Sequence, residues 1–130
     1  MLVYHGSKMS TNAFDNFRIR VRGAPQSSNH GRFRVPKYVA ASTSISQASR
    51  FTPNKILIHI YVPPECRNIG SLVGISVNNE EEEYLIPPYS VFTALMKYTY
   101  TENGQRQCVL VVQLAKDNQQ HPIDLPTLHF

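Results

Sequence analysis

The stretch that decides the fold is NEEEEYLIPPYSVF, residues 79–92, in which four consecutive glutamates precede an apolar run. The run YLI predicts a short strand over residues 83–86, which the two prolines that follow it end. Successive side chains of an extended segment point to opposite faces, so Glu81 and Glu83 share one face. The glutamates are therefore either a solvated acidic loop before a strand or carboxylates held at the rim of a sheet.

The chain of 130 residues suits one domain, residues 1–130, with a core of its own. Its composition, 42% hydrophobic and 17% charged, is typical of a globular protein rather than a disordered one. Its apolar runs are shorter than the roughly 18 residues that span a bilayer. The start MLVYHGSK lacks the basic and apolar regions of a signal peptide. We expect a soluble protein without membrane contact, either intracellular or delivered as an effector.

Cysteines and histidines give no pattern of metal ligands. Cys66 and Cys108 are too few for a disulfide framework and lack metal-ligand spacing. The five histidines include no H-x-x-x-H pair. We therefore expect no metal site.

The net charge of +4 is unevenly distributed, because residues 16–55 carry eight basic residues and no acid. Within this segment FRIRVR, residues 17–22, alternates apolar side chains with arginines. A strand over residues 18–22 would place the three arginines on one face. Such a stripe suits a dinucleotide diphosphate, a nucleic acid or an acidic protein surface, and the plain alternative is a solvated strand face.

Short strands dominate the pattern. Residues 2–5 predict a strand that ends in a tight turn at Gly6 and Ser7. Residues 55–62 alternate two apolar faces and give the clearest strand. We predict further strands over 38–42, 72–77, 90–101 and 106–114. The last two form a hairpin around the ENGQ turn.

The remaining segments predict short helices and loops. Residues 10–17 form one helical turn or a loop, and residues 23–32 form a loop. Ser44 and Gln47 have the spacing of a capping box, which predicts a helix with Ile45 and Ala48 facing inward and Pro53 at its end. The polar, proline-broken residues 115–130 predict a surface tail. The fold class is therefore α+β and strand-dominated, with one or two short helices.

Three clusters follow in order, each at a predicted strand end: YHGS at 4–7, STS at 42–44 and EEEEYLIPP at 80–88. Together they resemble the mono-ADP-ribosyltransferase family, in particular its arginine-modifying branch, over residues 2–114. The resemblance implies a core of two packed antiparallel sheets with an NAD cleft. It also implies NAD as co-substrate and an acceptor protein of unknown identity. The acceptor side chain would be arginine, and NAD hydrolysis would be a side activity.

The resemblance also implies roles for particular residues. Glu83 would stabilise the oxocarbenium-like state formed as the nicotinamide–ribose bond breaks. Glu81 would orient and deprotonate the acceptor guanidinium, and Ser42 would hold Glu83. The implied NAD-binding residues are His5, Gly6, Ser7, Thr43, Ser44 and Phe51.

The sequence departs from the arginine-modifying branch at His5, where that branch has arginine. Histidine there is similar to the diphtheria-type and poly(ADP-ribose) polymerase branch, which has tyrosine where this chain has Ser42. His5 could donate to a ribose hydroxyl or, if protonated, face a phosphate. Many relatives also carry a helical lobe before the first motif, so we expect a minimal core or a lobe lying elsewhere.

Two alternatives remain open. One is a non-catalytic module that binds NAD or ADP-ribose, which the histidine at position 5 favours. The other is a nucleic-acid-binding or nucleic-acid-modifying relative, such as an RNA 2′-phosphotransferase, which the basic segment favours. The E-x-E strand argues against the second alternative.

Overall fold

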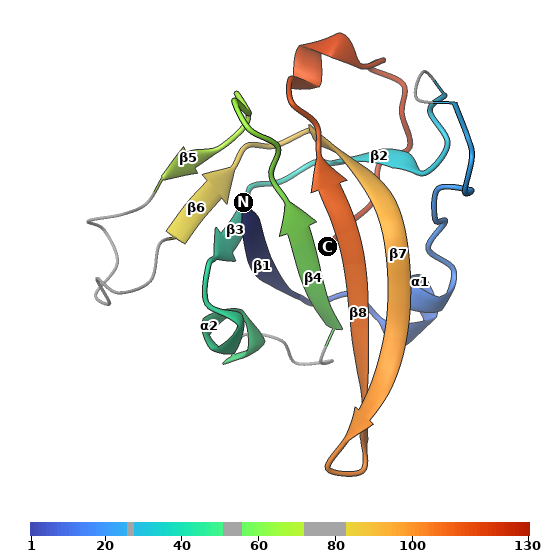
Figure 1. The fold of residues 1–130 in the computed structure, drawn as a ribbon, viewed down its shortest axis with the longest axis vertical. Coiled ribbons are helices and arrows are strands. Elements are labelled where there is room, and N and C mark those ends of the chain that lie inside the picture. Colours follow the sequence, from blue (N-terminus) through green and yellow to red (C-terminus); the bar gives the residue numbers. More distant parts are fainter. Residues whose placement is uncertain (26–27, 51–55, 72–82) are drawn as a thin grey trace.

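The computed structural model describes residues 1–25, 28–50, 56–71 and 83–130, which form a strand-dominated α+β domain (Figure 1). The strands are β1 (Leu2–Ser7), β2 (Arg32–Val35), β3 (Val39–Ser42), β4 (Ile56–Tyr61), β5 (Gly70–Ser71), β6 (Glu83–Ile86), β7 (Ser90–Glu102) and β8 (Gln105–Leu114). The helices are α1 (Thr11–Asp15), α2 (Ile45–Arg50) and the single 3₁₀ turn η1 (Asn118–Gln120). The expected fold class is confirmed. Among these described residues, no helix has the length and apolar character needed to cross a membrane.

The strands form one mixed sheet in the order β2-β7-β8-β4-β1-β3-β6-β5. Strands β4 and β8 are parallel, and the other neighbours are antiparallel. Strands β1 and β3 are joined by the single pair Tyr4–Ser42. The arrangement differs from the expected two antiparallel sheets, because this pair links β3, β6 and β5 to the other five strands.

Strand β4 fulfils the alternation seen in the sequence. Ile56, Ile58 and Ile60 are fully buried on one face, whereas Tyr61 on the other face is exposed. β-branched side chains suit a pleated surface packed on one side, which is why this segment forms a central strand. The predicted strands at 38–42, 83–86, 90–101 and 106–114 are also confirmed.

The long β7–β8 hairpin turns at two residues with positive φ. Asn103 has φ of 51° and Gly104 has φ of 76°. A two-residue turn with positive φ at both positions matches the right-handed twist of paired strands. The predicted hairpin is confirmed, and Figure 1 shows that its turn extends beyond the rest of the sheet.

The expected strand over residues 18–22 is wrong, because this segment has no regular structure. The Arg20 guanidinium donates hydrogen bonds to four carbonyl oxygens of the following loop, those of Ala24, Pro25, Ser28 and His30. A side chain at Gly31 would meet the Arg20 backbone at 2.8 Å, and its φ of +75° also suits glycine. The loop therefore closes around one arginine, which a regular strand would not allow.

The expected surface tail is also wrong. The Phe130 ring is 2% exposed and contacts the Phe33 and Phe92 rings, with centroids 5.6 Å and 5.1 Å away. The buried Arg34 guanidinium donates to carbonyl oxygens of Tyr89, Asn118, His121 and Pro122. An aromatic anchor and a buried arginine thus hold residues 118–130 against β2 despite their polar composition.

Smaller differences concern β1 and α2. Gly6 and Ser7 continue β1 instead of forming a turn, since Ser7 pairs with Ile56. On α2, Ala48 is buried as expected but Ile45 is 49% exposed. Residues 72–77, Pro53 and the side chain of Gln47 lie outside what the structure describes.

Candidate active site

Four predicted site residues line one cavity of about 340 Å³, which we call the junction cavity. It lies where β1, β3, β6 and α2 meet, and is lined by Tyr4, His5, Gly6, Ser42, Ala48 and Glu83 together with two alanines of β3. The structure therefore brings together His5, Gly6, Ser42 and Glu83 from three segments distant in the sequence.

Strand register explains why Glu83 and Ser42 are neighbours. Ser42 pairs with Glu83 across β3 and β6, and with Tyr4 across β3 and β1. Directly paired residues in antiparallel strands have Cβ atoms about 4.5–5.5 Å apart. The side chains of Glu83 and Ser42 are therefore direct neighbours. They lie at the point where a single residue pair joins β1 to β3.

Ser42 is buried, and its Oγ accepts the Ser44 N–H at 3.0 Å. A serine hydroxyl that accepts one hydrogen bond can still donate its own proton. The turn that follows leads into α2, where the Ala48 N–H donates to the Ser44 carbonyl. Ser42 therefore combines a fixed position at the start of the helix with a donor beside Glu83.

His5 is held in one tautomer. Its Nδ1 lies 2.7 Å from the Ala40 carbonyl oxygen. Because a carbonyl only accepts, Nδ1 must carry the proton and Nε2 must be the acceptor in the neutral ring. Among the described residues, the buried Nε2 has no hydrogen-bond partner. Nε2 can therefore accept a hydrogen bond from a bound hydroxyl group.

Burial lowers the pKa of His5 below its ordinary value. The Ala40 hydrogen bond opposes this effect, and the positive charge of Lys37 adds to it. Burial disfavours the charged imidazolium. The neutral ring favours contact with a hydroxyl over contact with a phosphate.

Three other predicted site residues that the structure describes, Ser7, Thr43 and Ser44, do not line the junction cavity. Ser7 is fully buried and its Oγ accepts the Met9 N–H at 3.0 Å, so it shapes the turn after β1. Thr43 and Ser44 follow β3 and do not line the cavity. Glu81 and Phe51 lie outside the described residues.

Sequence reasoning missed two aromatic neighbours of this site. Tyr4 lines the cavity and packs edge-on against His59, with ring centroids 4.9 Å apart. Phe130 lies against His5, with centroids 6.0 Å apart. Alternation along β1 could have placed Tyr4 on the face opposite His5. The position of Phe130 has no local sequence signal, because it depends on tertiary packing.

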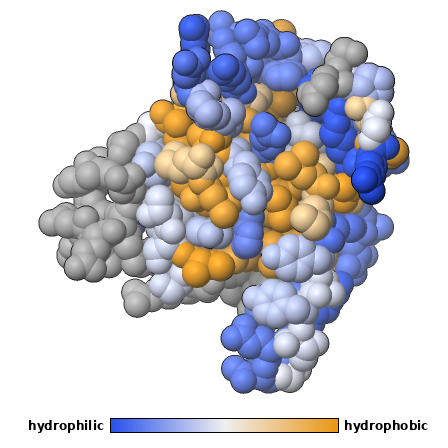
Figure 2. Space-filling model, viewed as in Figure 1, coloured by the Kyte–Doolittle hydropathy of each residue, from blue (hydrophilic) through white to orange (hydrophobic). Residues whose placement is uncertain are grey.

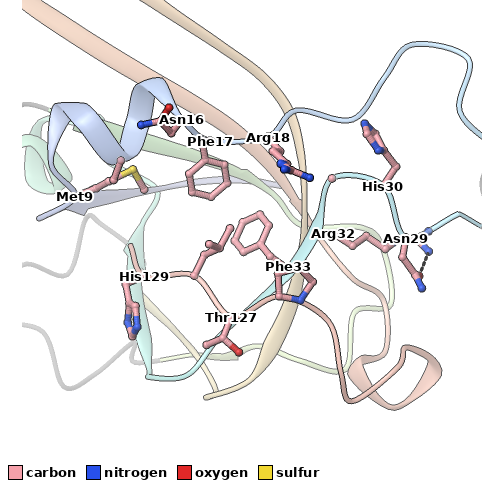
Figure 3. A pocket seen from close by; sticks show the side chains of 14 residues that line it. Met9, Asn16, Phe17, Arg18, Asn29, His30, Arg32, Phe33, Thr127 and His129 are labelled. Carbon is pink, nitrogen blue, oxygen red and sulfur yellow. Dashed lines mark hydrogen bonds between the residues drawn. The ribbon is translucent and has the colours of Figure 1, made fainter.

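A larger cavity of about 700 Å³, which we call the large cavity, is lined by none of the predicted site residues that the structure describes (Figure 3). Figure 3 shows the rings of Phe17 and Phe33 at its centre and Arg18, Arg32 and His30 toward one end. The Phe130 ring contacts Phe33, which lines the large cavity, and His5, which lines the junction cavity.

The expected stripe of Arg18, Arg20 and Arg22 on one strand face is not formed, because residues 18–22 are not a strand. Arg18 lines the large cavity, the Arg20 guanidinium donates to loop carbonyls, and Arg22 is exposed. None of these three lines the junction cavity. The described parts of the chain also contain no group of three or more His, Cys, Asp or Glu side chains that could hold a metal ion.

No protein-family model matches the sequence, and no curated protein does. Solved structures do match. HopU1, an ADP-ribosyltransferase of Pseudomonas syringae pv. tomato DC3000, has a TM-score of 0.58 at 19% identity, covering 88% of this chain and 45% of its own. The Vis toxin, an ADP-ribosyltransferase from Vibrio splendidus, has a TM-score of 0.64 at 14% identity, covering 98% and 53%.

C3larvin, an ADP-ribosyltransferase toxin from Paenibacillus larvae, has a TM-score of 0.58 at 17% identity, covering 88% of this chain and 61% of its own. This chain thus spans between 45% and 61% of the length of these three structures. At such low identity the likeness concerns the backbone arrangement. The chain has the fold of an ADP-ribosyltransferase core.

Proposed function

We propose that the protein transfers ADP-ribose from NAD to an arginine side chain of an acceptor protein and releases nicotinamide. One observation carries this proposal: Glu83, Ser42, His5 and Gly6 line one cavity on a fold shared with ADP-ribosyltransferases. The junction cavity is the proposed NAD cleft. A role as a toxin or effector, which the Vis and C3larvin matches suggest, forms part of the proposal.

Glu83 supplies the central electrostatic contribution. As the bond between nicotinamide nitrogen and ribose C1′ breaks, its electrons leave with neutral nicotinamide and positive charge develops on the ribose. The Glu83 carboxylate, hydrogen-bonded to a ribose hydroxyl, stabilises that charge. Removing one such preorganised contact typically lowers the rate by about 10²–10³. Ser42 acts as a positioning residue that holds the carboxylate.

Gly6 and His5 bind the substrate. The Gly6 backbone holds the nicotinamide carboxamide, and His5 Nε2 accepts a hydrogen bond from a ribose hydroxyl. The second role rests on the Nδ1–Ala40 contact, which leaves Nε2 as the acceptor. Thr43 and Ser44 support the end of β3, and Phe51 packs near nicotinamide. Ser7 contributes indirectly, through the turn that follows β1.

Glu81 gives the preference for arginine. A guanidinium is protonated at neutral pH and must lose a proton before its nitrogen attacks C1′. Glu81 accepts this proton, and the new bond joins C1′ to the acceptor nitrogen. A structure of Vis in complex with agmatine, a guanidino compound, supports this choice of acceptor. Water in place of the guanidinium gives NAD hydrolysis as a side activity.

A non-catalytic module that binds NAD or ADP-ribose is the second candidate. The observation that favours it is the neutral, carbonyl-bound His5, which supplies no positive charge beside a diphosphate. Such a module would bind NAD without releasing nicotinamide.

The test compares the wild type with Glu83→Gln, using NAD labelled in its adenine and agmatine as acceptor. We expect labelled agmatine and free nicotinamide from the wild type and a loss of about 10²–10³ in rate for the variant. Glu102→Gln, an equivalent change at the exposed hairpin turn, is the matched control and should retain full activity. Equal rates for wild type and Glu83→Gln would refute the role of Glu83. NAD binding without nicotinamide release would establish the second candidate.

A further inference from the structure

One face of the sheet, opposite the buried isoleucines of β4, carries exposed aromatic side chains around the buried valines Val109 and Val111. The side chains of this face belong to neighbouring strands and point the same way, because Tyr61 pairs with Gln113 and Gln113 pairs with Thr93. We call this the outer face. It comprises Leu2 and Tyr4 of β1, His59 and Tyr61 of β4, Thr93, Met96, Tyr98 and Tyr100 of β7, and Gln107, Val109, Val111 and Gln113 of β8. Figure 2 shows hydrophobic side chains gathered over the middle of the sheet and hydrophilic ones around them.

Three tyrosines of the outer face offer rings to solvent. Tyr61, Tyr98 and Tyr100 are 49%, 42% and 46% exposed. Tyr98 and Tyr100 are two residues apart and lie opposite Val109 and Gln107, so their rings stand on the same side of the hairpin. Exposed rings on a sheet are platforms on which unpaired bases stack, whatever the base.

A pocket of about 310 Å³ opens at one end of this face and is basic. Thr93 and Gln113 of the outer face line it together with four basic residues, Arg20, Arg32, Lys116 and His121. Its described lining contains no acidic residue. We call it the basic pocket. Its distance from Tyr98 is about 16 Å along β7, estimated from five residues at about 3.3 Å each.

The positive charges of the basic pocket disfavour one another: burial and the charge of Arg20 lower the pKa of Arg32. The Arg20 guanidinium donates its hydrogen bonds to loop carbonyl oxygens, which leaves its positive charge in place. Lys116 meets Glu65 at 3.7 Å in an exposed pair, which is weak. The pKa of His121 is lowered by burial and by the charges of Arg32 and Arg34, and Asp117 opposes this. The pocket therefore has a positive potential, and a bound anion would reduce the repulsion between its positive charges.

We propose that the outer face binds single-stranded nucleic acid, with phosphates in the basic pocket and bases on the tyrosines. This role goes beyond the proposed transferase function and does not depend on it. A ligand that consisted of phosphates alone would fill the basic pocket but would not contact the tyrosines. The same holds for an acidic protein surface. The rings also favour a single strand over a duplex, because paired bases cannot stack on them.

The first test measures fluorescence anisotropy of labelled 12-mers of oligothymidylate and oligouridylate. Three positive charges of the pocket, those of Arg20, Arg32 and Lys116, predict a slope of about −2 for log affinity against log salt, at about −0.7 per phosphate neutralised. Affinity should then fall about 20-fold between 50 and 200 mM salt. Lys116→Ala should reduce the slope to about −1.4. Lys8→Ala removes an equal charge outside the pocket and should leave the slope unchanged.

The second test concerns the rings. Tyr98→Ala should weaken binding at least about fivefold, whereas Tyr98→Phe keeps the ring and should bind like the wild type. Tyr38→Ala removes a tyrosine that is more exposed than Tyr98 but lies outside the outer face, and it should have no effect. Unchanged binding by Tyr98→Ala, or competition by polyglutamate as strong as by the oligonucleotide, would overturn the proposal. Glu83→Gln should bind normally, so this proposal and the transferase proposal can fail separately.

Discussion

The large cavity, at about 700 Å³, has twice the volume of the junction cavity, at about 340 Å³. The large cavity combines an apolar centre with a basic end, but no carboxylate lines its described part. The junction cavity holds a glutamate, a serine, a histidine acceptor and a glycine backbone within a few strand spacings. The comparison teaches that the kinds of groups a cavity brings together, rather than its size, indicate bond-breaking chemistry.

Phe130 packs against one residue of each cavity, Phe33 and His5, and removing its ring should have the largest effect on stability. Phe130→Ala should lower the free energy of unfolding by about 3–5 kcal/mol, because it leaves a void beside Phe33 and Phe92. Urea denaturation measures this change. Ile123→Ala, at a 93% exposed position of the same segment, is the control and should stay within about 0.5 kcal/mol. A loss below 1 kcal/mol for Phe130→Ala would mean that the segment packs loosely.

Ser42 tests how the junction cavity positions its carboxylate. Ser42→Ala should lower kcat for nicotinamide release about tenfold, since one hydrogen bond worth about 1–1.5 kcal/mol is lost near Glu83. The KM for NAD should change little, which distinguishes positioning from substrate binding. Ser46→Ala, an exposed serine of α2, is the control. An unchanged kcat for Ser42→Ala would remove Ser42 from the proposed mechanism.

His5 should give a smaller, pH-dependent effect. Its pKa is lowered in the folded protein by burial, so the unfolded chain takes up a proton first as the pH falls. Stability should therefore decrease from pH 7 to pH 5, and His5→Gln should flatten this dependence in urea denaturation at each pH. His59 and His121, whose pKa values burial also lowers, should keep part of the slope. Greater stability at pH 5 than at pH 7 would mean that His5 is charged when folded.

The sequence was informative where local pattern decides structure. Alternation predicted β4, the Asn-Gly turn predicted the hairpin, and proline bounded β6. These elements place Ser42 beside Glu83, so much of the junction cavity follows from strands that could be recognised locally.

Long-range contacts decided the rest. Residues 17–22 alternate as a strand would. However, the backbone N–H of Arg20 donates to the Ala94 carbonyl of β7, and its guanidinium donates to carbonyl oxygens of the following loop. Residues 115–130 look like a tail, yet Phe130 completes the core and touches His5. Arginines whose guanidinium groups donate to carbonyl oxygens leave no periodic signal, and neither does a single distant aromatic ring.

The most direct test of the account compares kcat for nicotinamide release from NAD between one variant in each cavity. With Glu83→Gln in the junction cavity we predict a loss of about 10²–10³. With Arg18→Ala in the large cavity we predict a kcat within about twofold of the wild type. A large loss for Arg18→Ala together with an unchanged Glu83→Gln would contradict the assignment of the chemistry to the junction of β1, β3 and β6.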